Sequence, residues 1–217
     1  MHKIIVPLAI LSSTLIPQLT QAQAPYDLET LIVSSGSDPI TSGVAGIARF
    51  RNRDGRFAEI SAQSENGWVS YGQYFAKGDL TLVTAGSVFH IQKALGVGLR
   101  FDASVPLSEL VILDLAYWPG LLFEEPEVWK TKNDGVENSE SVFHAQFGGV
   151  RLRIGPVHLS YYMLNFLDEP WNELPGASYT WAFRDDLAAS LSVTWNNNDQ
   201  DWLPWIGLTW SPSRSEE

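Results

Sequence analysis

The last strand-like stretch of the chain, residues 202–210, limits the possible folds more than any other feature. Every second side chain is large and apolar, and the ones between them are mixed in size and polarity. Successive side chains of a β-strand point to opposite sides. One face would carry Trp202, Pro204, Ile206, Leu208 and Trp210, and the other Leu203, Trp205, Gly207 and Thr209. The segment therefore predicts a strand with one strongly apolar face.

The same period of two recurs along the chain, with small or polar residues opposite the apolar ones. In residues 94–103 the apolar side chains alternate with glycine, arginine and aspartate. In residues 142–154 the apolar face changes phase at Gly148 and Gly149, which predicts a glycine bulge. Twelve strands are predicted, at residues 26–35, 44–52, 56–64, 67–76, 79–89, 94–103, 108–118, 142–154, 157–163, 177–183, 186–196 and 202–210.

The connections between these strands alternate in length, as they do in bacterial outer-membrane barrels. One set is short and rich in turn-forming residues: 53–55, 77–78, 104–107, 155–156 and 184–186. The other set contains every long connection: 36–43, 65–66, 90–93, 119–140, 167–176 and 197–201. If the chain ends on the periplasmic side, the short set is periplasmic and the long set faces outward.

The N-terminus has the features of a secretory signal peptide. A basic start is followed by an apolar run from Ile4 to Ile16 and by small residues around Ala22. We predict a signal peptide at residues 1–22 and one domain over residues 23–217, with a short tail at 211–217. No later segment approaches the roughly 20 apolar residues of a transmembrane helix.

A chain of this kind can span a membrane only as a closed barrel, because lipid offers no partners for backbone polar groups. The predicted fold is all-β: a single antiparallel transmembrane β-barrel of about 12 strands, with 8 or 10 as alternatives and a lumen lined by small and polar residues. A soluble periplasmic β-barrel or sandwich that carries a ligand is the competing interpretation. It is disfavoured because the polar faces carry glycine, serine and threonine rather than the lysine and glutamate of a soluble exterior.

The aromatic residues fit the membrane interpretation. The chain contains nine tryptophans, and tryptophan favours the two membrane–water interfaces. The predicted interface girdles contain Trp68, Trp118, Trp181, Trp195, Trp202 and Trp210.

The segment 202–210 also resembles the terminal strand of Gram-negative outer-membrane proteins, which ends in an aromatic residue after alternating apolar ones. The resemblance covers about ten residues in detail, and this chain continues past Trp210 to Glu217. It implies an outer-membrane location and assembly by the barrel assembly machinery. The expected surroundings are outer-membrane lipids and lipopolysaccharide.

Polar residues on the predicted inner faces are candidates for a solute path. They are Glu59, Arg100, Asp102, Asp114, His144, Arg151, Arg153 and Tyr162. The three arginines either line a path for anions or neutralise the acidic residues inside the barrel. Barrels of about eight strands are filled by side chains, and barrels of about sixteen contain an aqueous channel. Twelve strands fall between these sizes, so the strand number is compatible with either an open or a plugged lumen.

His158 and Ser160 share a strand face and are weak candidates for catalysis. They resemble the His-x-Ser arrangement of barrel lipid A deacylases, although Tyr161 stands where that family's motif has Asn. Activation of the serine would need a carboxylate to orient the histidine. The histidines lack metal-ligand spacing and the chain has no cysteine, so we expect no metal site and no cofactor.

The formal net charge of −11 disfavours nucleic acid as a partner. Many of the acidic residues fall in the predicted outer loops, chiefly at 124–140. The leading functional prediction is a narrow channel for small polar solutes. The alternatives are a non-conducting barrel that acts through these acidic loops, and a lipid-modifying enzyme that uses His158 and Ser160.

Overall fold

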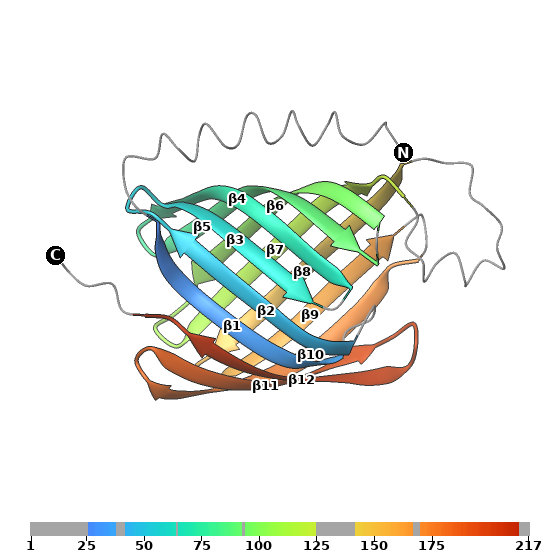
Figure 1. The fold of residues 1–217 in the computed structure, drawn as a ribbon. Coiled ribbons are helices and arrows are strands. Elements are labelled where there is room, and N and C mark those ends of the chain that lie inside the picture. The colour runs from blue at the N-terminus through green and yellow to red at the C-terminus, as the bar shows by residue number, and fades with distance from the viewer. Residues whose placement is uncertain are drawn as a thin grey trace.

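The chain folds into a single closed antiparallel β-barrel of twelve strands (Figure 1). Each strand pairs with the strands next to it in sequence, and the pairing of β1 with β12 closes the barrel. The computed structural model describes residues 26–37, 42–63, 65–92, 94–124, 142–166 and 170–212. The predicted signal peptide and the residues after 212 lie outside these ranges. No helix among the described residues is long and apolar enough to cross a membrane.

The strands incline together around the barrel axis (Figure 1). Their bounds are β1 Asp27–Ser37, β2 Ser42–Arg51, β3 Arg56–Gln63, β4 Asn66–Lys77, β5 Leu80–Ile91, β6 Ala94–Pro106, β7 Val111–Leu122, β8 Phe143–Ile154, β9 Val157–Phe166, β10 Asn172–Arg184, β11 Leu187–Asn196 and β12 Asp201–Trp210. The predicted twelve-strand antiparallel barrel is confirmed.

The barrel has two rims of different construction. Short turns close one rim, called here the turn rim, and the longer connections lie at the other, called here the loop rim. Gly78 and Gly155 begin two-residue turns at the turn rim with φ values of 59° and 56°. A residue without a Cβ adopts this left-handed conformation at little cost, which explains glycine at these two turns.

The polarity of the barrel is inverted relative to a soluble protein. Large apolar side chains stand exposed on the outer face, among them Ile60, Val69, Leu99, Leu191 and Ile206. Ionic side chains face inward and pair across strands. Since apolar surface is favourable in lipid and charge is not, this barrel is built for a membrane.

Strand β8 differs from its prediction. Its register with β7 and with β9 runs without a shift, so the predicted glycine bulge at Gly148 and Gly149 is wrong. Phe143, Ala145 and Phe147 share the inward face with Arg151 and Arg153, as the regular pairing requires. The apparent phase change arises because the apolar face is the inner one near the loop rim and the outer one near the turn rim.

The turn between β10 and β11 is tied to the end of β12. Arg184 donates two hydrogen bonds to the Asp186 carboxylate, at 2.9 and 2.8 Å, and the Trp210 indole donates a third at 3.2 Å. The hydrogen bonds from Arg184 hold the pKa of Asp186 below its ordinary value.

Candidate solute path through the barrel

A buried glutamate organises one half of the lumen. Glu59 on β3 is 2% exposed and accepts hydrogen bonds from Arg49 on β2 and Arg100 on β6, both at 2.7 Å. The Trp68 indole on β4 donates at 2.9 Å to Oε1, the carboxylate oxygen that also accepts from Arg100. Arg100 also donates to Asp102 at 2.5 Å, so ion pairs link β2, β3 and β6, and β4 joins them through the Trp68 hydrogen bond.

A second cluster lies around Asp114 on β7. Ser104 donates to Asp114 at 2.7 Å, and Arg151 and Arg153 on β8 each donate at 2.9 Å. The Arg151 side chain is 42% exposed and that of Arg153 is 32% exposed, although both point into the barrel. Two guanidinium groups share one carboxylate here, so this part of the wall carries excess positive charge.

The ion pairs of the lumen nearly balance. Within the described part of the chain, Glu29, Glu59, Asp102 and Asp114 pair with Arg49, Arg51, Arg100, Arg151 and Arg153. Among these pairs the excess of arginine lies at Asp114, which Arg151 and Arg153 share. The arginines that were candidates for an anion path are therefore each engaged by an acidic residue.

An arc of aromatic rings crosses the lumen beside these clusters. The ring of Trp68 lies 6.2 Å from that of Trp118, Trp118 lies 5.0 Å from Phe147, and Phe147 lies 5.3 Å from Tyr162. The Arg100 guanidinium sits over Trp118 at 4.6 Å, and the Trp118 indole donates to Asp102 at 2.7 Å. These rings hold the arginine side chain in place through cation–π contact as well as packing.

Small apolar clusters fill parts of the lumen near both rims. Ala94, Leu122, Phe143 and Ala145 pack together at the loop rim. Phe57, Val83 and Ala85 pack with Tyr74 toward the turn rim. These side chains come from strands β3 to β8 and narrow that half of the barrel, where a cavity of about 330 Å³ remains beside Trp68, Trp118 and Phe147.

The remaining arc of the wall, from β9 through β12 to β1, carries mostly small side chains on its inner face. The cross-strand pairs place Gly176 beside Ser160, Ser178 beside Ser192, and Ser190 beside Gly207. The serines of this arc keep partial solvent exposure inside the barrel. The larger Trp205 packs against Gly36, where an added Cβ would lie 2.7 Å from its ring.

Three of the predicted site residues face the opposite way from their prediction. Trp68 and Trp118 were predicted in the interface girdle, but both point into the lumen and donate to carboxylates. His144 was predicted to line the lumen, but it alternates with buried Phe143 and Ala145 and is exposed on the outer face. The physical reason is the same for all three: period two shows which residues share a face but leaves open which face is inside.

The other predicted residues lie on the expected faces. Glu59, Arg100, Asp102, Asp114, Arg151, Arg153 and Tyr162 face inward. Trp181, Trp202 and Trp210 are exposed on the outer face, and Trp195 contacts Trp202 at 5.1 Å. Sequence reasoning missed Arg49 and Tyr74, which complete the Glu59 cluster. The available signal was the two-residue spacing of Arg49 and Arg51, which places both on one face of a strand.

His158 and Ser160 lie on the inner face of β9, beside Arg153 and Arg151 in the register. Among the described residues no hydrogen bond joins them, and the carboxylate of nearby Asp114 is engaged by two arginines and a serine. This arrangement lacks the oriented histidine that activates a serine nucleophile. The described residues also contain no group of three or more histidine or acidic side chains that could hold a metal ion.

The acidic loop at 125–140, on which the non-conducting alternative rests, lies outside the described residues. Of the predicted acidic rim, the structure describes Glu124, Glu173, Asp199 and Asp201.

No family model matches the sequence, and no curated protein sequence matches it. Among solved structures, the barrel is similar to the KdgM porin, with a TM-score of 0.59 and 7% identity over 85% of this chain and 99% of that chain. A KdgM porin in complex with disordered oligogalacturonate gives a TM-score of 0.58, 9% identity and the same coverage. The NanC porin gives 0.56 and 11% identity over 86% of this chain and 100% of that chain. At these identities the likeness is one of fold.

Proposed function

We propose that this protein is a narrow outer-membrane channel for small polar solutes. The observation that carries the proposal is the uneven filling of the lumen. Ion pairs, aromatic rings and apolar clusters occupy the half formed by β3 to β8. The opposite arc presents serine, threonine and glycine that remain partly exposed. The likeness of the fold to porins supports the same conclusion.

The two halves would act differently on a solute. The paired charges of the narrowed half present a polar surface without a large net field, because each arginine is held by a carboxylate. The opposite arc offers hydroxyl groups that can exchange hydrogen bonds with water or with a solute. A path between them suits small hydrated solutes and favours anions slightly, because Arg151 and Arg153 share the single carboxylate of Asp114.

The first test is conductance. Purified protein in a planar bilayer should produce stepwise openings with a small unit conductance. In a gradient of potassium chloride, the reversal potential should show weak anion preference. Folded protein that inserts and gives no conductance, together with no solute uptake by vesicles, would overturn the proposal.

A matched pair of variants tests where the path runs. Ser190 points inward between Thr180 and Gly207, while its neighbour Leu191 is exposed on the lipid face. Ser190→Trp should reduce unit conductance at least about twofold, because pore diameter sets the flux. Leu191→Trp should leave conductance unchanged. Equal conductance in both variants would place the path elsewhere and contradict the arrangement argued here.

A further inference from the structure

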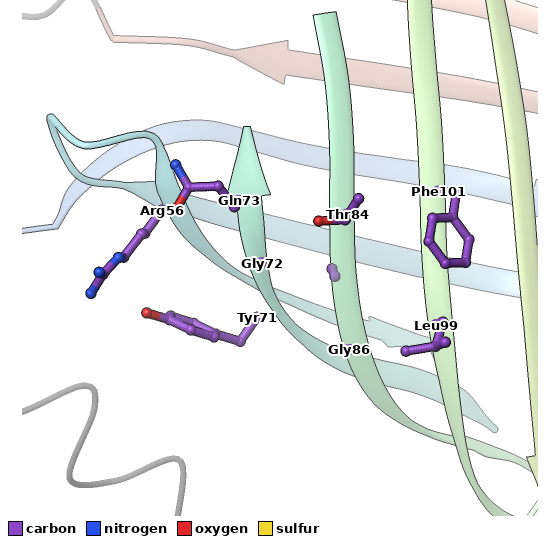
Figure 2. A pocket seen from close by; sticks show the side chains of 9 residues that line it. Arg56, Tyr71, Gly72, Gln73, Thr84, Gly86, Leu99 and Phe101 are labelled. Carbon is purple, nitrogen blue, oxygen red and sulfur yellow. The ribbon is translucent and has the colours of Figure 1, made fainter. Parts of the chain in front are cut away.

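A groove runs over the outer, membrane-facing surface of β3 to β8. It consists of two adjoining hollows of about 680 and 710 Å³, which share Tyr71, Gly86 and Leu99. Figure 2 shows the hollow nearer the turn rim, with Arg56, Gln73 and Tyr71 on one side and Phe101 and Leu99 on the other. The groove belongs to the exterior and is separate from the lumen.

The register of the sheet explains the groove. Gly86 on β5 pairs with Tyr71 on β4 and with Leu99 on β6, both of which carry large outward side chains. A Cβ added at Gly86 would meet no atom within 4 Å. The missing side chain therefore leaves a slot between two walls, with the backbone of β5 as its floor.

The groove is long enough for a segment of an acyl chain. Along β4 it extends from Gln73 to Val69, and along β5 from Thr84 to Val88. Four residues of strand span about 13 Å. Strands inclined at about 40° place this length across roughly 10 Å of depth, most of one leaflet of a hydrocarbon core about 30 Å thick.

A cation stands at the turn-rim end of the groove. Arg56 begins β3 and is exposed, and its guanidinium forms no ion pair with any described residue. Figure 2 shows Arg56 and Tyr71 extending toward the same side. A guanidinium at the level of the membrane interface matches a phosphodiester in charge and geometry. The sequence pattern predicts the turn rim on the periplasmic side, where the leaflet is formed by phospholipid.

We propose that this groove binds one glycerophospholipid, with its phosphodiester at Arg56 and an acyl chain over Gly86. The site goes beyond solute passage and does not depend on it, because the side chains that form its walls, Tyr71, Leu99 and Phe101, face away from the lumen. Its specificity comes from the slot and the cation together.

The test uses purified full barrel in detergent micelles and native mass spectrometry. Palmitoyl-oleoyl phosphatidylglycerol is the probe, and palmitoyl-oleoyl glycerol, which has the same chains and no phosphate, is the comparison lipid. Wild-type protein should retain one phosphatidylglycerol. Gly86→Leu should lower that occupancy about fourfold by filling the slot, because the lost burial of one acyl methylene changes binding by about that factor.

The matched control is Gly46→Leu. Gly46 is an outward glycine on β2 whose added Cβ also meets nothing within 4 Å, and it lines neither hollow. This variant should retain phosphatidylglycerol as the wild type does. A gel that separates folded from boiled protein establishes that each variant is a barrel before binding is measured.

Arg56→Gln still tests the proposal if Gly86→Leu fails to fold, because it changes only a side chain at the rim. It should lower phosphatidylglycerol occupancy about fivefold and leave palmitoyl-oleoyl glycerol binding unchanged. Equal phosphatidylglycerol retention by wild type and Arg56→Gln would overturn the proposal. So would equal loss in the Gly86 and Gly46 variants, or equal wild-type binding of both lipids.

Discussion

Replacing Glu59 by glutamine is expected to lower the free energy of unfolding of the barrel by about 3 kcal/mol. Glu59 is 2% exposed and receives hydrogen bonds from Arg49, Arg100 and Trp68. Glutamine has nearly the same shape, but it lacks the charge and turns one acceptor into a donor. The substitution therefore leaves two guanidinium groups facing an amide.

The expected loss of stability depends on whether each arginine has another carboxylate or solvent to interact with. Removing one partner of a buried ion pair costs about 3–5 kcal/mol. Arg100 keeps Asp102 as a partner, and the Arg49 side chain is 26% exposed to the lumen. Both facts place the expected loss at the lower end of that range.

The assay is urea unfolding of the protein refolded into lipid vesicles, followed by tryptophan fluorescence. The matched control is Glu109→Gln in the exposed turn between β6 and β7, which should change the free energy of unfolding by less than about 0.5 kcal/mol. The same Glu59→Gln protein should shift the reversal potential toward chloride, because the lumen loses a negative charge. If Glu59→Gln is no less stable than Glu109→Gln, the Glu59 cluster does not hold the wall together and the reasoning fails.

Two further predictions concern residues in direct contact: Gly149 beside Tyr162, and Arg184 beside Asp186. Gly149→Ala should destabilise the barrel by about 1–3 kcal/mol, because its Cβ would collide with the ring of Tyr162. Gly148→Ala is the control for this unfolding measurement: its Cβ meets nothing closer than 3.9 Å, so equal losses would refute the close packing. At the turn rim, Arg184→Gln should raise the pKa of Asp186 toward its ordinary value of about 3.9, since Arg184 donates the hydrogen bonds that lower it. The stabilisation from the Asp186 carboxylate is complete above that ordinary value and is lost as the pH falls through the lowered pKa, so the variant, whose folded pKa returns toward the unfolded one, should show less of this pH-dependent loss. Carboxyl NMR titration measures this shift, and an unchanged Asp186 pKa would contradict the assigned cause.

The strands were predicted well from the sequence because the alternation of side chains within each strand is visible without knowing its partners. Residues 94–103 and 186–196 alternate so regularly that a single strand reveals its two faces. The predicted boundaries of most strands fall within about three residues of the observed ones, and β10 begins earlier, at Asn172. Short turns such as Gly155–Pro156 were predicted from their turn-forming residue types.

The errors share one cause. Phe143, Ala145 and Phe147 were assigned to the lipid because they are apolar, and the predicted bulge followed from that assignment. In the structure they pack inside the loop rim, where Leu122 and Ala94 complete an apolar cluster. Trp68 and Trp118 were assigned to the interface because tryptophan favours it, yet each has a carboxylate to receive its indole hydrogen inside the barrel.

The sequence by itself determined that the chain forms twelve strands with alternating faces, because that alternation is a local property of the extended backbone. Only the tertiary structure decided which face is inside near the rims, since curvature and closure bring together side chains from strands distant in sequence. The Glu59 cluster joins β2, β3, β4 and β6, and the outer groove depends on the register of β4, β5 and β6. Partners of this kind follow from pairing and closure, which no single strand encodes.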